Sequence, residues 1–139
     1  LRTRLDMLAV ATSWTRFGLP EGLIAPEDKA LDIHGGFIET SVMLALRPAL
    51  VDMSKAENFP SKQSDFAKEF KHLRAYGPHA FGWKMHDLNV QGVAGNASAA
   101  TAKAGEKILT HAVAGFIELL QDVDQFDLAR FTPEVLART

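Results

Sequence analysis

The most regular pattern of hydrophobic positions in this 139-residue chain lies between residues 38 and 46. Apolar residues recur there at the spacing of one helix face, and they are Ile38, Val42, Met43, Ala45 and Leu46. Arg47 and Pro48 follow at once, and proline does not continue a helix. The pattern therefore predicts a helix that has Glu39 in its first turn and ends before Pro48.

Two apolar stretches on either side of this helix are typical of strands. Leu5 to Thr12 is an apolar run suited to a strand buried in a parallel sheet. Val90 to Ala94 is a shorter strand-like segment that follows a cluster of aromatic residues. Residues 13–29 are punctuated by Pro and Gly, so they predict a loop between the first strand and the helix.

A second, longer helix is predicted after a turn at Gly95. Asn96 or Ser98 would cap it, and it runs to about Val123 with an apolar stripe of Leu109, Val113, Phe116 and Leu120. The order strand, loop, helix, strand, helix predicts an α/β fold, a layered α/β/α domain with a mainly parallel sheet.

The stretch from residue 58 to residue 80 differs from its surroundings because it is polar and charged. Phe66, Phe70 and Leu73 have helical spacing within it, which predicts a short amphipathic helix. We expect a surface insertion that covers the edge of the domain, with a lid or an oligomer contact as the alternative.

Composition narrows the class of protein. A chain of 139 residues with 47% hydrophobic content is large enough for one compact domain, or for half of one. Fifteen basic and seventeen acidic residues give a net charge of -2, so no electrostatic footprint for nucleic acid or an anionic membrane is visible. The absence of cysteine excludes disulfides, thiolate zinc sites and a cysteine nucleophile. With no signal-like or membrane-spanning apolar run, a cytoplasmic protein is expected.

Residues 32–41 combine an imidazole, a glycine pair and a carboxylate at the start of the predicted helix. Glu39 would lie where unpaired backbone N–H groups and the helix dipole favour a negative charge. The glycines at 35 and 36 would allow the backbone to approach another group closely. Two interpretations stay open on residue types alone. His34 and Glu39 form a functional site, or Glu39 only matches the dipole and His34 is a buried, hydrogen-bonded histidine.

Other candidate residues give weaker signals. Trp14 lies in the loop after the first predicted strand, where α/β folds build binding sites, so it is either a wall of a substrate pocket or a packing anchor. His79 and His86 are seven residues apart, which matches no compact metal-ligand pattern. No nucleotide-binding glycine motif and no G-x-S-x-G element are present.

Two segments resemble signatures of the creatininase (creatinine amidohydrolase) family. Residues 32–41, continued by residues 43–51, resemble its His-small-Gly-acid-x-Glu-Thr-Ser segment and the helix that follows. Residues 92–106 are similar to its second signature, Gly-x-x-Gly-Asp-Pro, then Ala-Thr and Gly-Glu, in the same order. Two departures bear on substrate preference rather than on fold. Phe37 stands where many members carry an acid, and Asn96-Ala97 replaces Asp-Pro.

The resemblance implies that residues 1–139 are the C-terminal part of a single creatininase-like domain. Family members are two-metal hydrolases whose ligands lie in the first half of a chain about twice this long, and those motifs are not found here. Divalent ions (zinc, manganese or iron) would therefore be bound mainly by the N-terminal half of the same protein, and no metal ligand is assigned in this chain. A homo-oligomer, commonly a hexamer, is a further expectation from the family.

The function that the resemblance implies is metal-dependent hydrolysis of a non-peptide C–N bond, cyclic or linear, in a small nitrogenous molecule. His34 would pass a proton to the leaving nitrogen. Glu39 would hold the His34 proton in place or bind N–H groups of the substrate, and Trp14 and Phe37 would line the substrate pocket. This chain alone would be inactive. The alternative is a non-catalytic oligomerising or regulatory piece of a diverged family member.

Overall fold

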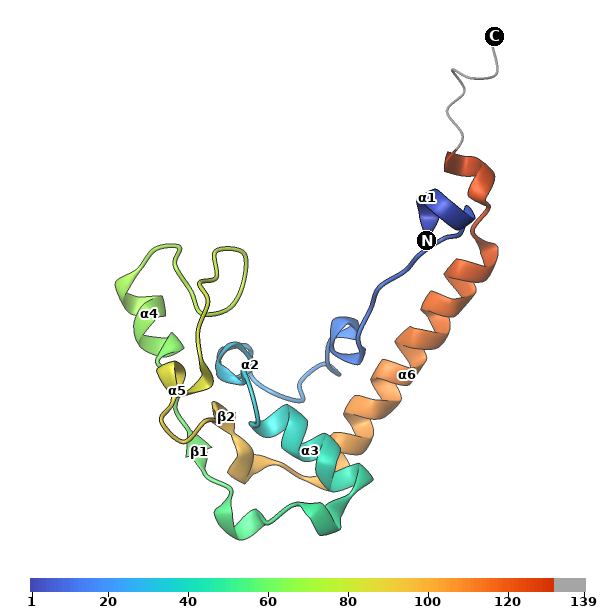
Figure 1. Ribbon diagram of the computed structural model, residues 1–139. Helices are drawn as coiled ribbons and strands as arrows, with labels where there is room; N and C mark the ends of the chain where they lie inside the picture. The colour runs from blue at the N-terminus through green and yellow to red at the C-terminus, as the bar shows by residue number, and fades with distance from the viewer. Residues whose placement is uncertain (132–139) are drawn as a thin grey trace. The chain divides into compact units, whose positions relative to one another are not determined.

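The computed structural model describes residues 1–131 of the chain (Figure 1). The chain divides into two compact units. One contains residues 1–19 and the chain from His111 onward, and the other contains residues 20–110. Residues 32–41, which carry the candidate site, belong entirely to the second unit.

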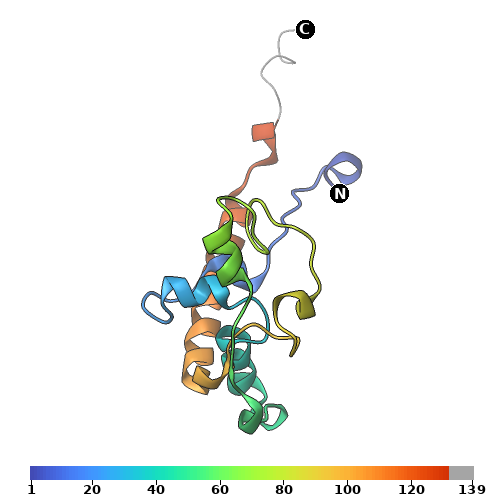
Figure 2. The same cartoon turned by 90° about the vertical axis from the view of Figure 1, so that its left-hand side faces the viewer.

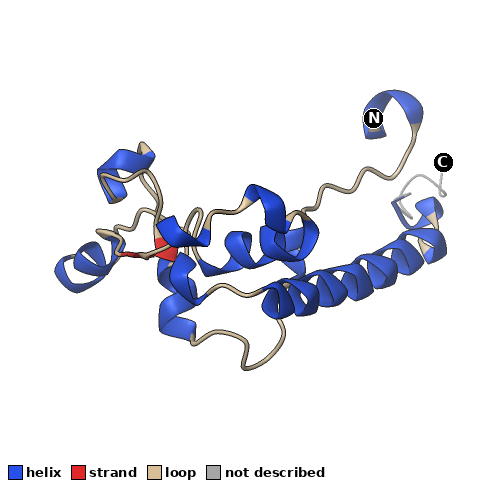
Figure 3. Cartoon of the chain, turned by 90° about the horizontal axis from the view of Figure 1, so that it is seen from below, coloured by secondary structure: helices blue, strands red, loops and turns tan. Residues whose placement is uncertain are grey.

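Helices and loops dominate both units (Figure 3). The first unit contains α1 (Arg2–Leu5), the 3₁₀ helix η1 (Trp14–Phe17), the larger part of α6 (Ala102–Gln125) and the 3₁₀ helix η5 (Leu128–Phe131). The second unit contains α2 (Pro26–Leu31), α3 (Phe37–Leu46), α4 (Gln63–Glu69), α5 (Met85–Leu88), the strands β1 (Asn58–Phe59) and β2 (Gly95–Asn96), the 3₁₀ helices η2 (Pro48–Leu50), η3 (Met53–Lys55) and η4 (Ala97–Ala99), and the start of α6.

The predicted α/β/α fold with a mainly parallel sheet is confirmed only in part. Helices and strands are both present, but β1 and β2 pair antiparallel, with Phe59 opposite Gly95. The predicted strand over Val90 to Ala94 is wrong except at its last residue, where Ala94 forms an isolated antiparallel bridge with His34.

The predicted strand over Leu5 to Thr12 is also wrong for this structure. Helix α1 extends to Leu5, and the chain beyond it has no regular secondary structure up to Ser13. A strand needs a neighbour to pair with its backbone groups. Among residues 1–131, no backbone–backbone hydrogen bond involves residues 7–12. An apolar run is therefore not sufficient to form a strand here.

The helix predicted from the apolar stripe is confirmed as α3. It ends at Leu46, and Pro48 lies just beyond, where it cannot disturb the helical hydrogen bonds. The N–H of Arg47 makes the last bond, to the carbonyl of Met43, at 2.7 Å. Sequence periodicity was sufficient because the signal is local to ten residues.

Helix α3 packs very closely on the first turns of α6, and the two lie side by side in Figures 1 and 2. A Cβ placed on Gly105 would lie 2.0 Å from the carbonyl oxygen of Ser41. Ser41 is fully buried, and its hydroxyl accepts the backbone N–H of Thr101 at 3.2 Å. These contacts hold the face of α3 that carries Ser41 against the start of α6.

The start of α6 differs from the prediction. Thr101, and neither Asn96 nor Ser98, caps the helix, because its Oγ1 accepts the N–H of Ala104 at 3.1 Å. Ser98 and Asn96 instead hydrogen-bond to each other at 2.7 Å, around η4. The 3₁₀ helix η4 therefore occupies the predicted start, and α6 begins several residues later.

The stretch from residue 58 to residue 80 contains α4, which begins at Gln63. The amide oxygen of Gln63 accepts the N–H of buried Ala75 at 2.8 Å, and Phe66 packs edge-on against Phe81 with ring centroids 5.4 Å apart. These contacts order the segment internally. Its role as a surface insertion or lid stays a prediction.

The first unit is held by aromatic contacts around Phe17. Its ring lies edge-on to Phe116, with 6.2 Å between centroids, and its carbonyl oxygen is 3.0 Å from the Nε2 atom of His111. Trp14 lies on the same short helix η1 and is 38% exposed. No helix among residues 1–131 has both the length and the apolar character needed to cross a bilayer.

Candidate active site

The loop between α2 and α3 is tied to the segment that precedes β2. The N–H groups of Ile33 and His34 both donate to the carbonyl of Ala94, at 2.9 and 3.1 Å. The N–H of Ala94 donates back to the carbonyl of His34 at 2.8 Å. The backbone of His34 is therefore fixed by a segment about sixty residues away in sequence.

Two glycines allow the loop to cross β2 so closely that a Cβ atom on either would clash with the other backbone. A Cβ on Gly36 would lie 2.7 Å from the Cα of Gly95, and a Cβ on Gly95 would lie 2.8 Å from the Cα of Gly36. Gly35 has a φ of +67°, a conformation that favours glycine. The glycine pair expected to permit a close approach does so, and the group approached is the backbone of β2.

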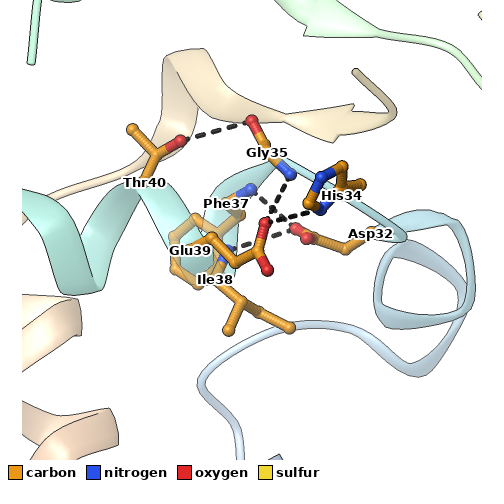
Figure 4. Close-up of polar contacts among 7 residues, drawn as sticks. All are labelled: Asp32, His34, Gly35, Phe37, Ile38, Glu39 and Thr40. Atoms are coloured by element: carbon orange, nitrogen blue, oxygen red, sulfur yellow. Dashed lines mark hydrogen bonds and ion pairs between the residues drawn. The ribbon is translucent and has the colours of Figure 1, made fainter. Parts of the chain in front are cut away.

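The carboxylate of Asp32 supplies the cap of α3. Its Oδ2 atom accepts the N–H groups of Phe37 and Ile38 at 2.6 and 3.3 Å (Figure 4). Burial raises the pKa of Asp32 above the ordinary value of 3.8. The two N–H donors lower the pKa, and the neighbouring charge of Glu39 raises it.

Glu39 and His34 lie together, as the sequence predicted. The Oε2 atom of Glu39 accepts the N–H of Gly35 at 2.7 Å and lies 3.2 Å from the Nδ1 atom of His34 (Figure 4). The hydroxyl of Thr40 also reaches back and donates to the carbonyl of Gly35 at 3.3 Å. The His34 and Glu39 side chains are 62% and 45% exposed, so the interpretation of His34 as a buried histidine is wrong.

The contact with Glu39 distinguishes the two nitrogens of the His34 ring. A carboxylate oxygen accepts but does not donate, so a proton on Nδ1 would face the Oε2 atom of Glu39. The Nε2 atom then remains for exchange with another molecule. An imidazole oriented by a carboxylate is an arrangement suited to general acid–base chemistry.

A cavity of about 370 Å³ adjoins the base of the loop within the second unit. Its lining includes Asp32, Phe37, Asn58, Phe59, Ser64 and Asn96. Phe37, predicted to contact substrate, is thus at the wall of a cavity. Trp14, the other predicted substrate contact, belongs to the first unit, so its role in a pocket stays a prediction.

The described residues do not fit a metal ion by themselves. No group of three or more His, Asp or Glu side chains within residues 1–131 is arranged to hold one. The Oδ2 atom of Asp32 accepts backbone N–H groups. The Oε2 atom of Glu39, which contacts His34, accepts the N–H of Gly35. His79 packs against His72, with ring centroids 5.6 Å apart.

Asp32 is the residue whose role the sequence did not predict. Its contact with α3 spans five residues of a loop whose path depends on the Gly36–Gly95 crossing. The only sequence signal is an acid shortly before a helix whose own N-cap position, Gly36, has no side chain.

Comparison with known proteins identifies the family of this chain. A family model described as "Creatininase: Creatinine amidohydrolase" matches residues 1–120. The chain is similar to a solved candidate creatinine amidohydrolase from Bacteroides fragilis NCTC 9343, with 28% sequence identity and a TM-score of 0.67. The match covers 91% of this chain but 47% of that protein, so the chain spans about half of its length. No curated protein is significantly similar. The chain belongs to the creatininase family.

Proposed function

We propose that the protein to which this chain contributes is an amidohydrolase that cleaves a non-peptide C–N bond in a small nitrogenous molecule. Family membership supports a hydrolase. The observation that carries the proposal further is the exposed His34 side chain, whose Nδ1 atom contacts Glu39. The loop that carries it is hydrogen-bonded to Ala94 and to Glu39. Since the chain spans about half of its solved relative, the activity is assigned to the protein with both halves.

His34 would act on the leaving group. An amine anion leaves poorly, so cleavage of an amide C–N bond needs a proton delivered to the nitrogen as the bond breaks. In the protonated ring, Nε2–H would donate that proton while Nδ1–H faces the carboxylate of Glu39. The carboxylate would hold the ring in place and stabilise its positive charge before the transfer.

Glu39 has a second oxygen with which to serve the substrate. Both described contacts of its carboxylate use Oε2. No hydrogen bond to Oε1 is made by any group in residues 1–131. This atom would accept an N–H of the substrate, so one side chain would combine both predicted roles of Glu39.

Further parts of the proposal rest on the family alone. Metal dependence, with zinc, manganese or iron held mainly by the N-terminal half, belongs to it, and so do a homo-oligomer such as a hexamer and a cytoplasmic location. These properties are proposed for a protein of the length of the solved relative, about half of which this chain spans.

A second candidate function is a non-catalytic oligomerising or regulatory role. It is favoured by Phe37 and Asn96, which stand at the positions of family acids and both line the cavity. The two candidates differ in one measurable respect, which is turnover of amides by the intact protein.

The test is replacement of His34 by Ala in the intact protein, with creatinine as the first probe and other cyclic and linear amides after it. We expect turnover to fall by roughly 10² to 10⁴. His86→Ala is the matched control, because His86 is an exposed histidine on α5, outside the loop. Equal turnover in the two variants, with equal metal content, would contradict the role of His34. No turnover in the unmodified protein across the panel would favour the non-catalytic candidate.

A further inference from the structure

Asp32 is the contact through which α2 and the start of α3 are joined. Its backbone N–H closes α2 by donating to the carbonyl of Asp28 at 3.0 Å. Its side chain accepts the first two N–H groups of α3, those of Phe37 and Ile38. Gly36 occupies the N-cap position and has no side chain that could accept these N–H groups. The first turn of α3 is therefore satisfied from outside the helix.

The surroundings of Asp32 leave little freedom for another arrangement. A Cβ on Gly36 would lie 2.8 Å from its Oδ1 atom, and a Cβ on Gly95 would lie 3.1 Å from its Cγ atom. The carboxylate thus packs against the crossing of the two glycines. Along the chain, Gly36 lies between His34 and the first residue of α3, so this crossing is close to both.

The contacts of the loop run in opposite directions. Asp32 reaches forward to α3, while Glu39 and Thr40 on α3 reach back to Gly35. Without the forward contact, the first turn of α3 is held to the loop by the side chains of Glu39 and Thr40 and by the backbone N–H of Thr40, which donates to the carbonyl of Gly36 at 3.2 Å. The Nδ1–Oε2 separation of His34 and Glu39 depends on that turn.

We infer that Asp32 is a positioning residue for the His34–Glu39 pair, because its carboxylate holds the first turn of α3 against the loop that carries His34. The carboxylate acts as a hydrogen-bond acceptor and touches neither the His34 ring nor the proton that His34 would transfer. The catalytic use of the pair rests on the proposed function, but the positioning itself does not.

The direct test uses the chain itself and measures the tautomer of His34 by nitrogen NMR at a pH where the ring is neutral. The unmodified protein is expected to show one dominant tautomer, with the proton on Nδ1. Asp32→Ala removes the acceptor, so a mixture of tautomers is expected. Asp32→Asn keeps an acceptor oxygen of the same size and should restore the single tautomer. Asp28→Ala removes an exposed acid one turn earlier and should change nothing.

Three results would overturn the inference. The tautomer ratio of Asp32→Ala would equal that of the unmodified protein, or Asp32→Asn would resemble Asp32→Ala, or Asp28→Ala would disturb the ring equally. In the intact protein, we expect Asp32→Ala to lower kcat about tenfold or more with little change in KM, and Asp32→Asn to retain most of it. If His34→Ala leaves turnover unchanged, the proposed function fails, while the tautomer measurement still decides the role of Asp32.

Discussion

At the scale of single residues, one oxygen of each carboxylate makes the described contacts of the site. Glu39 uses Oε2 for both the Gly35 N–H and the His34 ring, and Asp32 uses Oδ2 for the start of α3. The proximity of His34 and Glu39 could be predicted because they are five residues apart, at the start of a helix with a clear pattern. The capping role of Asp32 could not, because it depends on how Gly36 crosses Gly95.

The raised pKa of Asp32 has a consequence for stability that can be measured. Its protonated form is favoured in the folded state, so its contribution is fully present below its ordinary value of 3.8 and is lost as pH rises through the raised value. Asp32→Asn has no charge to bury but keeps the acceptor. Urea unfolding between about pH 3 and about pH 7 should therefore show the variant gaining stability relative to the unmodified protein as pH rises. A difference that stays constant over this range would contradict the effect of burial.

The cap itself should be visible in the same experiment. Asp32→Ala removes the acceptor for Phe37 and Ile38 at the start of α3, so we expect a loss of about 1 kcal/mol in the free energy of unfolding at neutral pH. Glu21→Ala is the control, since Glu21 is an exposed acid in a turn outside the helices. Equal losses in both variants would show that Asp32 acts only through charge.

At the scale of elements, structure that depends on local contacts could be predicted, and structure that depends on long-range contacts could not. The stripe from Ile38 to Leu46 is complete within one segment, and α3 follows it. Leu5 to Thr12 has the composition of a strand, but a strand also needs a partner, which residues 1–131 do not supply. The sequence could not show that α6 starts at Ala102. The 3₁₀ helix η4 precedes it and directly follows β2, and the position of β2 depends on long-range contacts.

The crossing of α3 and α6 gives a prediction at this scale. Replacing a glycine inside a helix by alanine normally stabilises it by about 1 kcal/mol. Gly105→Ala should instead destabilise the chain by about 2 kcal/mol or more, because the new Cβ would meet the backbone of Ser41 at 2.0 Å and the helices would have to separate. Gly115→Ala is the comparison, since its Cβ would meet only side-chain atoms of Phe17, the nearest at 2.7 Å, and a side chain can shift more readily than a helix backbone. A smaller loss for Gly105→Ala than for Gly115→Ala in thermal or urea unfolding would contradict the close crossing.

At the scale of the whole molecule, much apolar surface in the first unit is exposed. Met7 and Val10 in the segment after α1 are about half exposed, at 49% and 51%, and so are Val113, Ile117 and Leu120 on α6, at 57%, 50% and 51%. Exposed apolar surface of this kind usually marks a contact with another chain or segment. The solved relative is about twice as long as this chain. If the proposed N-terminal half is part of this protein, we expect it to cover this surface.

Hydrogen exchange can test this expectation. Residues 7–12 should exchange rapidly in the isolated chain, because none makes a backbone–backbone hydrogen bond within residues 1–131. In the intact protein, they should exchange at least about tenfold more slowly if the other half pairs with them. Equal exchange rates in the two samples would show that the other half does not order this segment.

Chemical rescue can show whether His34 supplies the proton for C–N bond cleavage. Turnover of an amide by the intact His34→Ala protein should be measured with increasing amounts of added imidazole. We predict that turnover is lost without imidazole and partly restored by it, because a diffusing imidazole replaces the missing proton donor. His34→Ala protein that works as well as the unmodified protein, with or without imidazole, would contradict the account.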